Sequence, residues 1–367
     1  MSNDRIVELL EKSREEKGFP AYAAAWGTYD KEPNVVWGGR FTYAADAPVV
    51  KRDSMFDLAS LTKVIATTTV AMSLYEEGRF TLDQPVQSLY PGFVGAGKEA
   101  ITVRHLLLHN SGLPAYRSFH TFCDTPETTR SAVGIEPLKE KPETATVYSC
   151  VGFITLQQVL ERVGRAPLNE LFVDRVTAPL ELNLLRFAPG PEFRQGCVPT
   201  SRIEPWRREW AEKNGDPMAG TFIRGRVHDP AAFVMGGVSG NAGLFATIDH
   251  VAQFARVMAN LGDFEGMQVV QPETVREWTT RAGPTSTRAL GWDTRSAEGS
   301  SSGQYFSDRS FGHTGYTGTS MWIDPERKAY AVLLTNRVHP DDSSNATVRV
   351  RPQFADLVAA ALGFGPR

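Results

Sequence analysis

The feature that most constrains the fold of this 367-residue chain is that its strand-like segments lie near both ends of the sequence. Residues 21–26 form a short apolar run typical of a buried strand, and residues 35–41 are predicted to be its hairpin partner. Near the other end, residues 319–323 and 330–334 flank the turn Asp324-Pro325-Glu326 and predict a second hairpin. Between these two ends, apolar residues recur mainly at helical spacing.

This order of segments predicts an α/β fold of the α+β type. An antiparallel sheet lobe flanked by helices would be built from both termini, residues 1–59 and 280–367, and residues 60–279 would form an inserted, mainly helical lobe. Two lobes also suit the length, because 367 residues exceed what one hydrophobic core usually organises. The cleft between the lobes is the expected place for an active site.

Charge and composition exclude several classes of function. A net charge of −3, with no basic run or stripe, argues against nucleic acid as a partner. The N-terminal segment has no apolar core of signal-peptide length and no other segment could span a membrane, so a cytoplasmic protein without a membrane partner is expected. The widely spaced Cys123, Cys150 and Cys197 predict neither a disulfide framework nor a zinc ribbon.

The run Phe56-Asp57-Leu58-Ala59-Ser60-Leu61-Thr62-Lys63 carries the strongest chemical signal. It is predicted to begin a helix that Asp57 caps and Gly78 ends. Residues three apart on a helix share a face, so the Ser60 hydroxyl and the Lys63 amine would lie together. A neutral lysine can activate a serine nucleophile, and both burial and the positive end of a helix dipole lower a lysine pKa. A plain helix start with a solvated lysine is the alternative.

Three other segments hold polar groups that an acyl-transfer site needs. Tyr148, just before a predicted helix, is a candidate phenolic acid or base, although a buried tyrosine with one hydrogen bond is the simpler interpretation. The glycines of residues 311–318 would let a substrate approach an edge strand, or would form an ordinary turn. Residues 236–243 lack phosphate-binding spacing and are expected to be a tight loop lining the cleft. Residues 115–146 show little periodicity and predict a long loop over the site.

Two histidine patterns are explained without a functional role. His105 and His109 are four residues apart, but only leucines lie between them, so no metal site is predicted. In His228-Asp229-Pro230, Asp229 as a helix cap with Pro230 in the first helical position is simpler than a Ser-His-Asp triad. The chain has no G-x-S-x-G motif, which argues against an α/β-hydrolase.

Three motifs follow one another in the order of a known family: Ser60-Leu61-Thr62-Lys63, Tyr148-Ser149-Cys150 and His313-Thr314-Gly315. The sequence resembles the serine β-lactamases and penicillin-binding proteins, in particular the branch of class C β-lactamases, D-alanyl-D-alanine carboxypeptidases and family VIII esterases. The signature of that branch is S-x-x-K, then Y-x-N, then K-T-G or H-T-G. The run at residues 106–114 and the loop at residues 236–243 also match, and the resemblance extends from about Pro20 to the C-terminal helix.

The resemblance implies the role of each motif residue. Ser60 would attack a carbonyl and form an acyl-enzyme, while Lys63 and Tyr148 shuttle the proton, and which of the two is the base stays open. The backbone N–H groups of Ser60 and Tyr316 would form the oxyanion hole. The resemblance assigns substrate binding to the remaining motif positions: Cys150, His313, Thr314 and Gly315.

Two residues depart from the family pattern. Cys150 stands where β-lactamases carry an asparagine that binds the lysine and the substrate amide, and a thiol is a poor replacement for an amide. His313 stands where a lysine attracts antibiotic carboxylates, and an unperturbed histidine is mostly neutral at pH 7. Both departures favour esterase or D-amino-acid peptidase chemistry over an efficient β-lactamase.

Three functions therefore remain open. The leading hypothesis is a serine hydrolase that forms an acyl-enzyme at Ser60 on small esters or amides. The second is a true β-lactamase or D-alanyl-D-alanine carboxypeptidase, and the third is a ligand-binding or sensor protein that acylates without turnover. In each case the partner is a small-molecule ester, amide or β-lactam, no cofactor or metal is needed, and the oligomeric state stays open.

Overall fold

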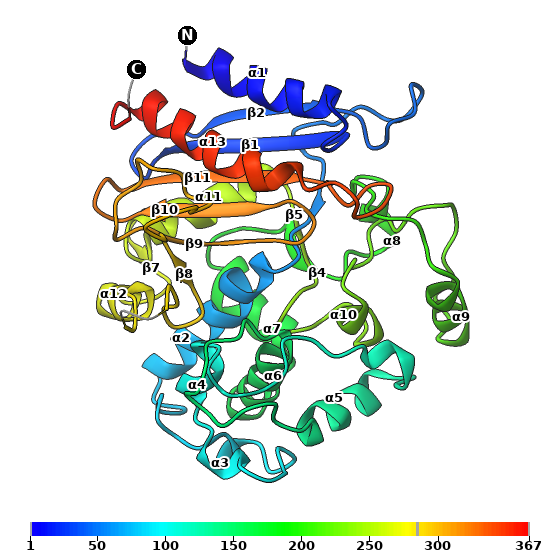
Figure 1. Ribbon diagram of the computed structural model, residues 1–367, viewed down its shortest axis with the longest axis vertical. Coiled ribbons are helices and arrows are strands. Elements are labelled where there is room, and N and C mark those ends of the chain that lie inside the picture. Colours follow the sequence, from blue (N-terminus) through cyan, green and yellow to red (C-terminus); the bar gives the residue numbers. More distant parts are fainter. Residues whose placement is uncertain (1, 284–285, 366–367) are drawn as a thin grey trace.

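The computed structural model describes residues 2–283 and 286–365 and confirms the predicted α+β fold with an antiparallel sheet (Figure 1). Neighbouring strands of its six-stranded sheet run antiparallel. The strand order is β2 (Asn34–Gly39), β1 (Ala21–Thr28), β11 (Ala329–Thr335), β10 (Ser320–Asp324), β9 (Phe311–Thr314) and β8 (Asp293–Thr294). Strands from both ends of the chain therefore pair directly at β1 and β11, and both predicted hairpins are present.

The central strands bury both faces, so their side chains divide between two cores. In β1, Ala21, Ala23 and Ala25 belong to one core, whereas Tyr22 and Trp26 belong to the other. Successive side chains of a strand point to opposite faces, which explains why this strand is apolar throughout.

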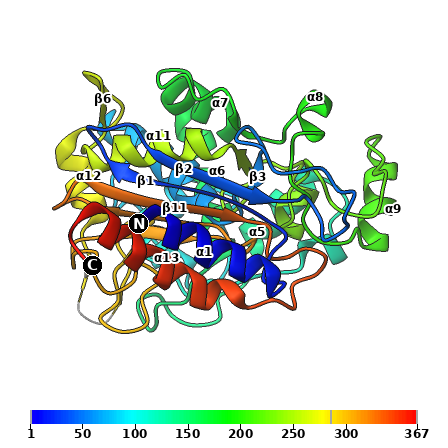
Figure 2. The same ribbon diagram turned by 90° about the horizontal axis from the view of Figure 1, so that it is seen from above.

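Helices cover the two faces of the sheet. α1 (Ser2–Glu15) and α13 (Ala346–Leu362) lie side by side on one face, and α11 (Ile248–Ala259) lies on the other (Figures 1 and 2). Ile6, Leu10 and Phe354 supply the core under the first pair, with Trp26 from the sheet. The first and the last described helices of the chain therefore lie on the same side of the sheet.

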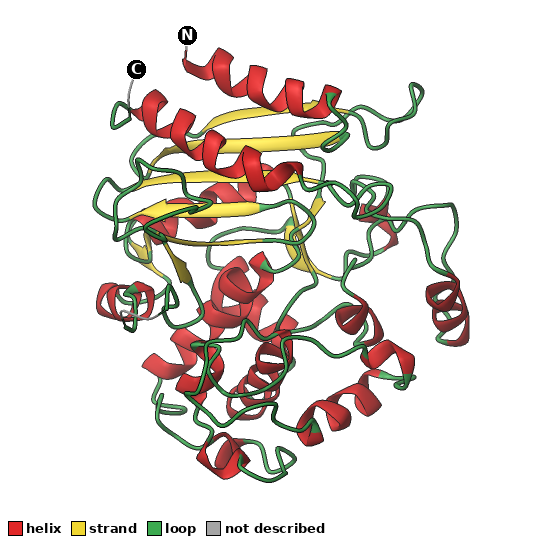
Figure 3. Cartoon of the chain, in the orientation of Figure 1, coloured by secondary structure: helices red, strands yellow, loops and turns green. Residues whose placement is uncertain are grey.

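The middle of the chain is mainly helical, and most of it lies beyond the end of the sheet formed by β9 and β8 (Figures 1 and 3). Its helices are α2 (Thr69–Glu76), α3 (Val86–Leu89), α4 (Val103–Leu107), α5 (Pro126–Ile135), α6 (Cys150–Gly164), α7 (Leu168–Phe172), α8 (Pro191–Arg194), α9 (Pro205–Lys213), α10 (Pro230–Val234) and α12 (Pro272–Thr279). A small sheet of β3 (Phe56–Asp57), β5 (Leu244–Ala246) and β4 (Leu185–Phe187) lies between them and the large sheet, and β6 (Asp263–Phe264) pairs with β7 (Met267–Gln268).

One segment differs from its predicted structure. Residues 115–146 were expected to be a long loop, but they contain a 3₁₀ turn at Phe119–Thr121 and helix α5. Thr125 caps α5 by accepting a hydrogen bond from the Thr128 backbone N–H, and Pro126 occupies the first turn. These capping signals define the helix even though its apolar periodicity is weak.

The division of the chain into lobes stays a prediction. α11 lies within residues 60–279, which were assigned to the helical lobe, yet it packs against β1 and β11 of the large sheet. Among the described residues, no helix is both long and apolar enough to cross a bilayer.

Candidate active site

Ser60 lies in a turn that leads directly into a π-helical segment, Lys63–Thr68, and then into α2. The prediction that Asp57 caps this helix is wrong, because Asp57 ends strand β3. Its buried carboxylate accepts hydrogen bonds from the backbone N–H groups of Ala59, at 2.8 Å, and His228, at 2.7 Å. Ala59 adopts a positive φ of 47°, a strained conformation for a residue with a Cβ. Asp57 thus fixes the backbone that presents Ser60.

The Lys63 ammonium group is completely buried behind Ser60. Its Nζ donates to Ser60 Oγ at 3.2 Å, to the Asn241 carbonyl oxygen at 3.0 Å and to Cys150 Sγ at 3.5 Å. A thiol is a weak acceptor, so the Asn241 carbonyl is the strongest of the three at holding the amine in place. The predicted proximity of Ser60 and Lys63 is present.

Tyr148 occupies the third corner of this cluster, two residues before helix α6. Its ring centroid lies 4.8 Å from Lys63 Nζ and 4.8 Å from the centroid of the buried His109 ring. Ser149, the N-cap of α6, anchors the segment, because its backbone N–H donates to His109 Nδ1 and its hydroxyl to the Pro114 carbonyl. The Tyr148 hydroxyl interacts with both Lys63 and Ser60, although neither contact among the described residues has the geometry of a full hydrogen bond.

Burial and mutual interaction set the protonation of this cluster. Burial disfavours the Lys63 cation, but the neighbouring acidic groups of Cys150 and Tyr148 outweigh it, so the pKa of Lys63 is raised. Burial raises the pKa of Tyr148 and of Cys150, although the Lys63 charge opposes both shifts. The three groups therefore titrate as one coupled cluster, because the Lys63 cation and the ionised forms of Cys150 and Tyr148 stabilise each other, whereas burial alone would favour a neutral lysine.

The turn between β9 and β10 closes the site from the sheet side. The Thr317 and Thr319 hydroxyls donate to the carbonyls of Asp57, at 2.7 Å, and Leu58, at 3.0 Å. A Cβ on Gly315 would lie 2.6 Å from the Leu58 carbonyl oxygen, so only glycine permits this close approach. The sheet is therefore joined to the residues just before Ser60, and Tyr316 follows at the cavity wall.

One cavity beside Ser60 is rich in positive charge. It has a volume of 360 Å³, and its lining includes Thr314, Gly315 and Tyr316. The described residues that line it also include three guanidinium groups and one carboxylate: Arg288, Arg337, Arg351 and Asp293. We call this cavity the arginine pocket.

His313 lies in the wall of the arginine pocket and is 4% exposed. Burial, reinforced by the charges of Arg288 and Lys63, holds its pKa well below the usual value, so the ring is neutral. His313 Nδ1 is 2.7 Å from the Thr314 carbonyl oxygen and donates to it, which leaves Nε2 as an acceptor with no partner among the described residues. The expectation that His313 brings little charge agrees with this shift, but the nearby arginines supply the charge it lacks.

A second and larger cavity, of 650 Å³, also opens at Ser60. Ser60, Tyr148 and Tyr316 line both cavities. Cys150, His228 and Tyr116 also line the second one. Four carboxylates are among its described lining residues, Glu204, Asp229, Asp341 and Asp342, and we call it the acidic pocket.

The loop at residues 236–243, predicted to line the cleft, supplies the carbonyl of Asn241 and places Ala242 in the acidic pocket. The loop is bound to neighbouring helices, since Thr67 Oγ1 donates to the Gly240 carbonyl and the Gly240 N–H donates to Gln157 Oε1. Sequence reasoning did not identify Asn241 as a partner of Lys63, because a backbone carbonyl contact leaves no residue-type signal.

The histidine predictions have mixed outcomes. Asp229 caps α10 as predicted, with Pro230 in the first turn. His228, which was assigned no role, nevertheless lines the acidic pocket, and burial lowers its pKa to about 3, so it is neutral there. His105 Nε2 lies 3.3 Å from Glu143, and the described residues contain no cluster of three side chains able to hold a metal ion.

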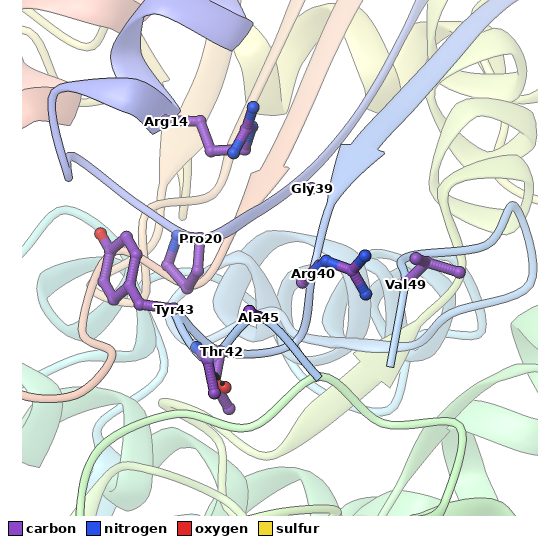
Figure 4. A pocket seen from close by; sticks show the side chains of 9 residues that line it. Arg14, Pro20, Gly39, Arg40, Thr42, Tyr43, Ala45 and Val49 are labelled. Atoms are coloured by element: carbon purple, nitrogen blue, oxygen red, sulfur yellow. Dashed lines mark hydrogen bonds between the residues drawn. The ribbon is translucent and has the colours of Figure 1, made fainter. Parts of the chain in front are cut away.

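A third cavity lies away from this site, at the C-terminal end of β2 (Figure 4). Arg14 and Arg40 line its 360 Å³ volume, but Arg14 is paired with Glu11 at 2.6 Å and Arg40 donates to the Ala47 carbonyl at 2.7 Å. It shares no described lining residue with the two cavities at Ser60. Both guanidinium groups in this cavity therefore already have partners within the protein.

Comparison with known proteins agrees with this geometry. The family model described as beta-lactamase matches residues 6–353, nearly the whole chain. The chain belongs to the beta-lactamase family. The resemblance found in its motifs is thereby confirmed, and its place among hydrolases is shown by the family and by the names of its relatives.

Two relatives illustrate the range of the family. The N-acetylmuramyl-L-alanine amidase of Bacillus subtilis is 31% identical over 336 residues, which cover 83% of this chain and 74% of that protein. A protein of Escherichia coli K12 assigned as a D-alanyl-D-alanine carboxypeptidase is 29% identical over 344 residues, covering 87% of this chain and 76% of that protein.

Solved structures share the fold. A penicillin-binding protein homologue from Caulobacter crescentus superposes with a TM-score of 0.77 at 17% identity, covering 97% of this chain and 96% of that one. EstCE1, a hydrolase with promiscuous acyltransferase activity, gives 0.73 at 20% identity, covering 96% and 98%. At this identity the likeness shows the fold alone.

Proposed function

We propose that this protein is a serine hydrolase that forms an acyl-enzyme at Ser60 on small esters or amides. The observation that carries the proposal is the contact of Ser60 Oγ with the buried Lys63 amine at 3.2 Å, with Tyr148 beside both. Lys63 and Tyr148 would take the Ser60 proton and return it to the leaving group, after which water releases the acyl group. The backbone N–H groups of Ser60 and Tyr316 would stabilise the oxyanion, where one donor is typically worth about 10²–10³ in rate.

Hydrolysis of p-nitrophenyl butyrate tests this proposal. We expect turnover by the purified protein and a loss of at least about 10³ in kcat/KM for Ser60→Ala, since the nucleophile is removed. Ser131→Ala, at an exposed serine of α5, is the matched control and should keep full activity. Retention of most of the rate in Ser60→Ala would overturn the mechanism.

A second candidate function, hydrolysis of a D-alanyl peptide or a β-lactam, has support from the arginine pocket. Substrates of this kind carry a carboxylate, and guanidinium groups bind carboxylates well. Arg288, Arg337 and Arg351 would offer the positive charge that His313 does not. The assigned carboxypeptidases among the relatives agree with this choice.

A comparison of rates on different substrates separates the two candidate functions. Release of D-alanine from a D-Ala-D-Ala peptide, or turnover of nitrocefin, at a kcat/KM at least tenfold above that for p-nitrophenyl butyrate would favour the second function. Stoichiometric labelling of Ser60 without product release would instead favour a sensor that acylates only once. Arg288→Gln should lower the rate on the carboxylated substrate and leave the neutral ester within about twofold.

A further inference from the structure

Two cavities of opposite charge meet at Ser60. The arginine pocket and the acidic pocket share Ser60, Tyr148 and Tyr316 as walls, so a molecule bound with its carbonyl at Ser60 would extend into both. Such an arrangement sorts ligands by the sign of the charge at each end.

The carboxylates of the acidic pocket keep acceptor capacity free. Asp342 Oδ2 accepts from the Tyr316 hydroxyl at 2.6 Å, and Asp341 Oδ1 accepts from the Ser343 N–H at 3.1 Å. Each carboxylate has about four lone-pair sites, so one such bond leaves room for a ligand. Both residues are exposed at the rim, where the cavity meets solvent.

Positive charge in the acidic pocket is limited. Arg202 is the only guanidinium among its described lining residues, and it lies 5.4 Å from the Phe222 ring centroid. Arg207 lies buried behind the wall and is bound to Glu204 at 2.7 Å. The neutral His228 adds no charge. With Glu204 paired to Arg207, Asp229, Asp341 and Asp342 remain against Arg202 and the adjacent Arg337, whose Nη1 donates to the Asp342 carbonyl at 3.3 Å, so the balance of charge is still negative.

The arginine pocket has the opposite character. Arg351 donates to the carbonyls of Gly315, at 2.7 Å, and Thr319, at 3.0 Å, so it braces the wall. Arg288 is 3.7 Å from Asp293 and lies over the Tyr148 ring at 5.2 Å, close to the expected reaction centre. The buried His313 Nε2 adds an acceptor without a partner, suited to an N–H or O–H of the ligand.

We infer that the natural substrate is zwitterionic, with an anionic group such as a carboxylate on one side of the scissile carbonyl and a cationic amino group on the other. This inference rests on the proposed function, because Ser60 is taken as the reacting centre, and it adds the amino group that the acidic pocket selects. Peptide-like amides with one free amino group and one free carboxylate belong to this class.

Binding to the Ser60→Ala protein tests the inference without chemistry. Calorimetry would compare 6-aminohexanoyl-glycine with hexanoyl-glycine, 6-aminohexanoyl-glycinamide and hexanoyl-glycinamide, which lack one charge or both. N-(2-aminoethyl)adipamic acid, with the two charges exchanged, tests the other orientation. We expect the zwitterion in the preferred orientation to bind at least tenfold more tightly than the singly charged hexanoyl-glycine and 6-aminohexanoyl-glycinamide.

Paired variants assign each charge to its pocket. Asp341→Asn with Asp342→Asn should reduce the preference for the amine at least threefold and leave the preference for the carboxylate, and Arg288→Gln should do the reverse. The matched controls are Asp46→Asn with Asp53→Asn, and Arg5→Gln, at exposed residues outside both cavities. Equal affinity for zwitterionic and neutral amides would overturn the inference.

The proposed function fails in a different way. If Ser60 were never acylated, the proposed function would be wrong. A zwitterion preference in the Ser60→Ala protein would then still support the class of ligand. If Ser60 were acylated by neutral esters while the binding preference was absent, the mechanism would stand and the substrate class would be wrong.

Discussion

The residue that controls the proposed chemistry is Lys63, whose proton must leave before Ser60 can attack. Its pKa is raised because the acidic groups of Cys150 and Tyr148 outweigh the effect of burial. A base with a raised pKa is mostly protonated at neutral pH and becomes active as the pH rises. We therefore expect kcat/KM for p-nitrophenyl butyrate, corrected for spontaneous hydrolysis, to rise steadily from pH 6.5 to pH 9. A plateau already reached at pH 6.5 would contradict this protonation state.

Cys150 gives a second prediction at the same scale. Its Sγ is 3.5 Å from Lys63 Nζ, and a thiol is a weak acceptor. Cys150→Asn places a carboxamide there that can also bind a substrate amide, as the family asparagine does, and one such hydrogen bond that strengthens in the transition state is worth about 1.4 kcal/mol, or roughly tenfold in rate. We expect kcat/KM on amide substrates to rise about tenfold, while Cys150→Ala stays within about threefold of the parent. A loss of activity in a folded Cys150→Asn protein would show that the thiol has a role of its own.

At the scale of secondary-structure elements, the joint between the β9–β10 turn and the Ser60 backbone holds the site together. Gly315→Ala would place a methyl group 2.6 Å from the Leu58 carbonyl oxygen, well inside van der Waals contact. We expect a loss of at least about 10² in kcat/KM and a lower Tm in thermal unfolding, because the turn must move away from Ser60. The control is Gly283→Ala, where no described atom lies within 4 Å of the added Cβ. Unchanged activity in Gly315→Ala would show that this joint does not position Ser60.

The elements differ in how well the sequence predicts them. Period-two and helical patterns were enough for the β1–β2 and β10–β11 hairpins and for α6, because local spacing defines them. The position of Asp57 was predicted wrongly, since its carboxylate is bound by the N–H of His228, 171 residues away. A local capping rule cannot detect such a contact.

The same limit applies to the site. Motif order brought attention to Ser60, Lys63 and Tyr148, which the structure places together. Arg288 and Arg351 have no motif, and only the folded sheet and α13 bring them to one cavity. The opposite charges of the two cavities at Ser60 are therefore visible in the structure and not in the sequence.

At the scale of the whole molecule, buried neutral histidines make stability depend on pH. Burial lowers the pKa of His109, His228 and His313, so the folded state excludes protons that the unfolded chain binds below pH 6.5. As the pH drops through 6.5, each of these histidines lowers the free energy of unfolding by up to about 1.4 kcal/mol per pH unit. Burial raises the pKa of Asp57 to about 6 and also raises that of Asp356, which opposes the trend at lower pH, but burial lowers the pKa of His120, His250 and His339 as well.

The free energy of unfolding should therefore decrease between pH 7.5 and pH 5.5. Urea unfolding followed by tryptophan fluorescence at constant ionic strength would measure it. An unfolding midpoint that stays constant or rises over this range would contradict the neutral state of the buried histidines.

The central claim for the molecule is that Ser60, held between Lys63 and the β9–β10 turn, is the nucleophile that carries the acyl group. Rapid quenching with acid during turnover of p-nitrophenyl butyrate, followed by peptide mass spectrometry, tests this most directly. The account predicts a butyryl adduct, about 70 Da in mass, on the peptide that contains Ser60, formed within the first turnover and absent from Ser60→Ala. Turnover with no adduct at Ser60 at any quench time, or an adduct on another residue that is formed and lost at the rate of turnover, would contradict it.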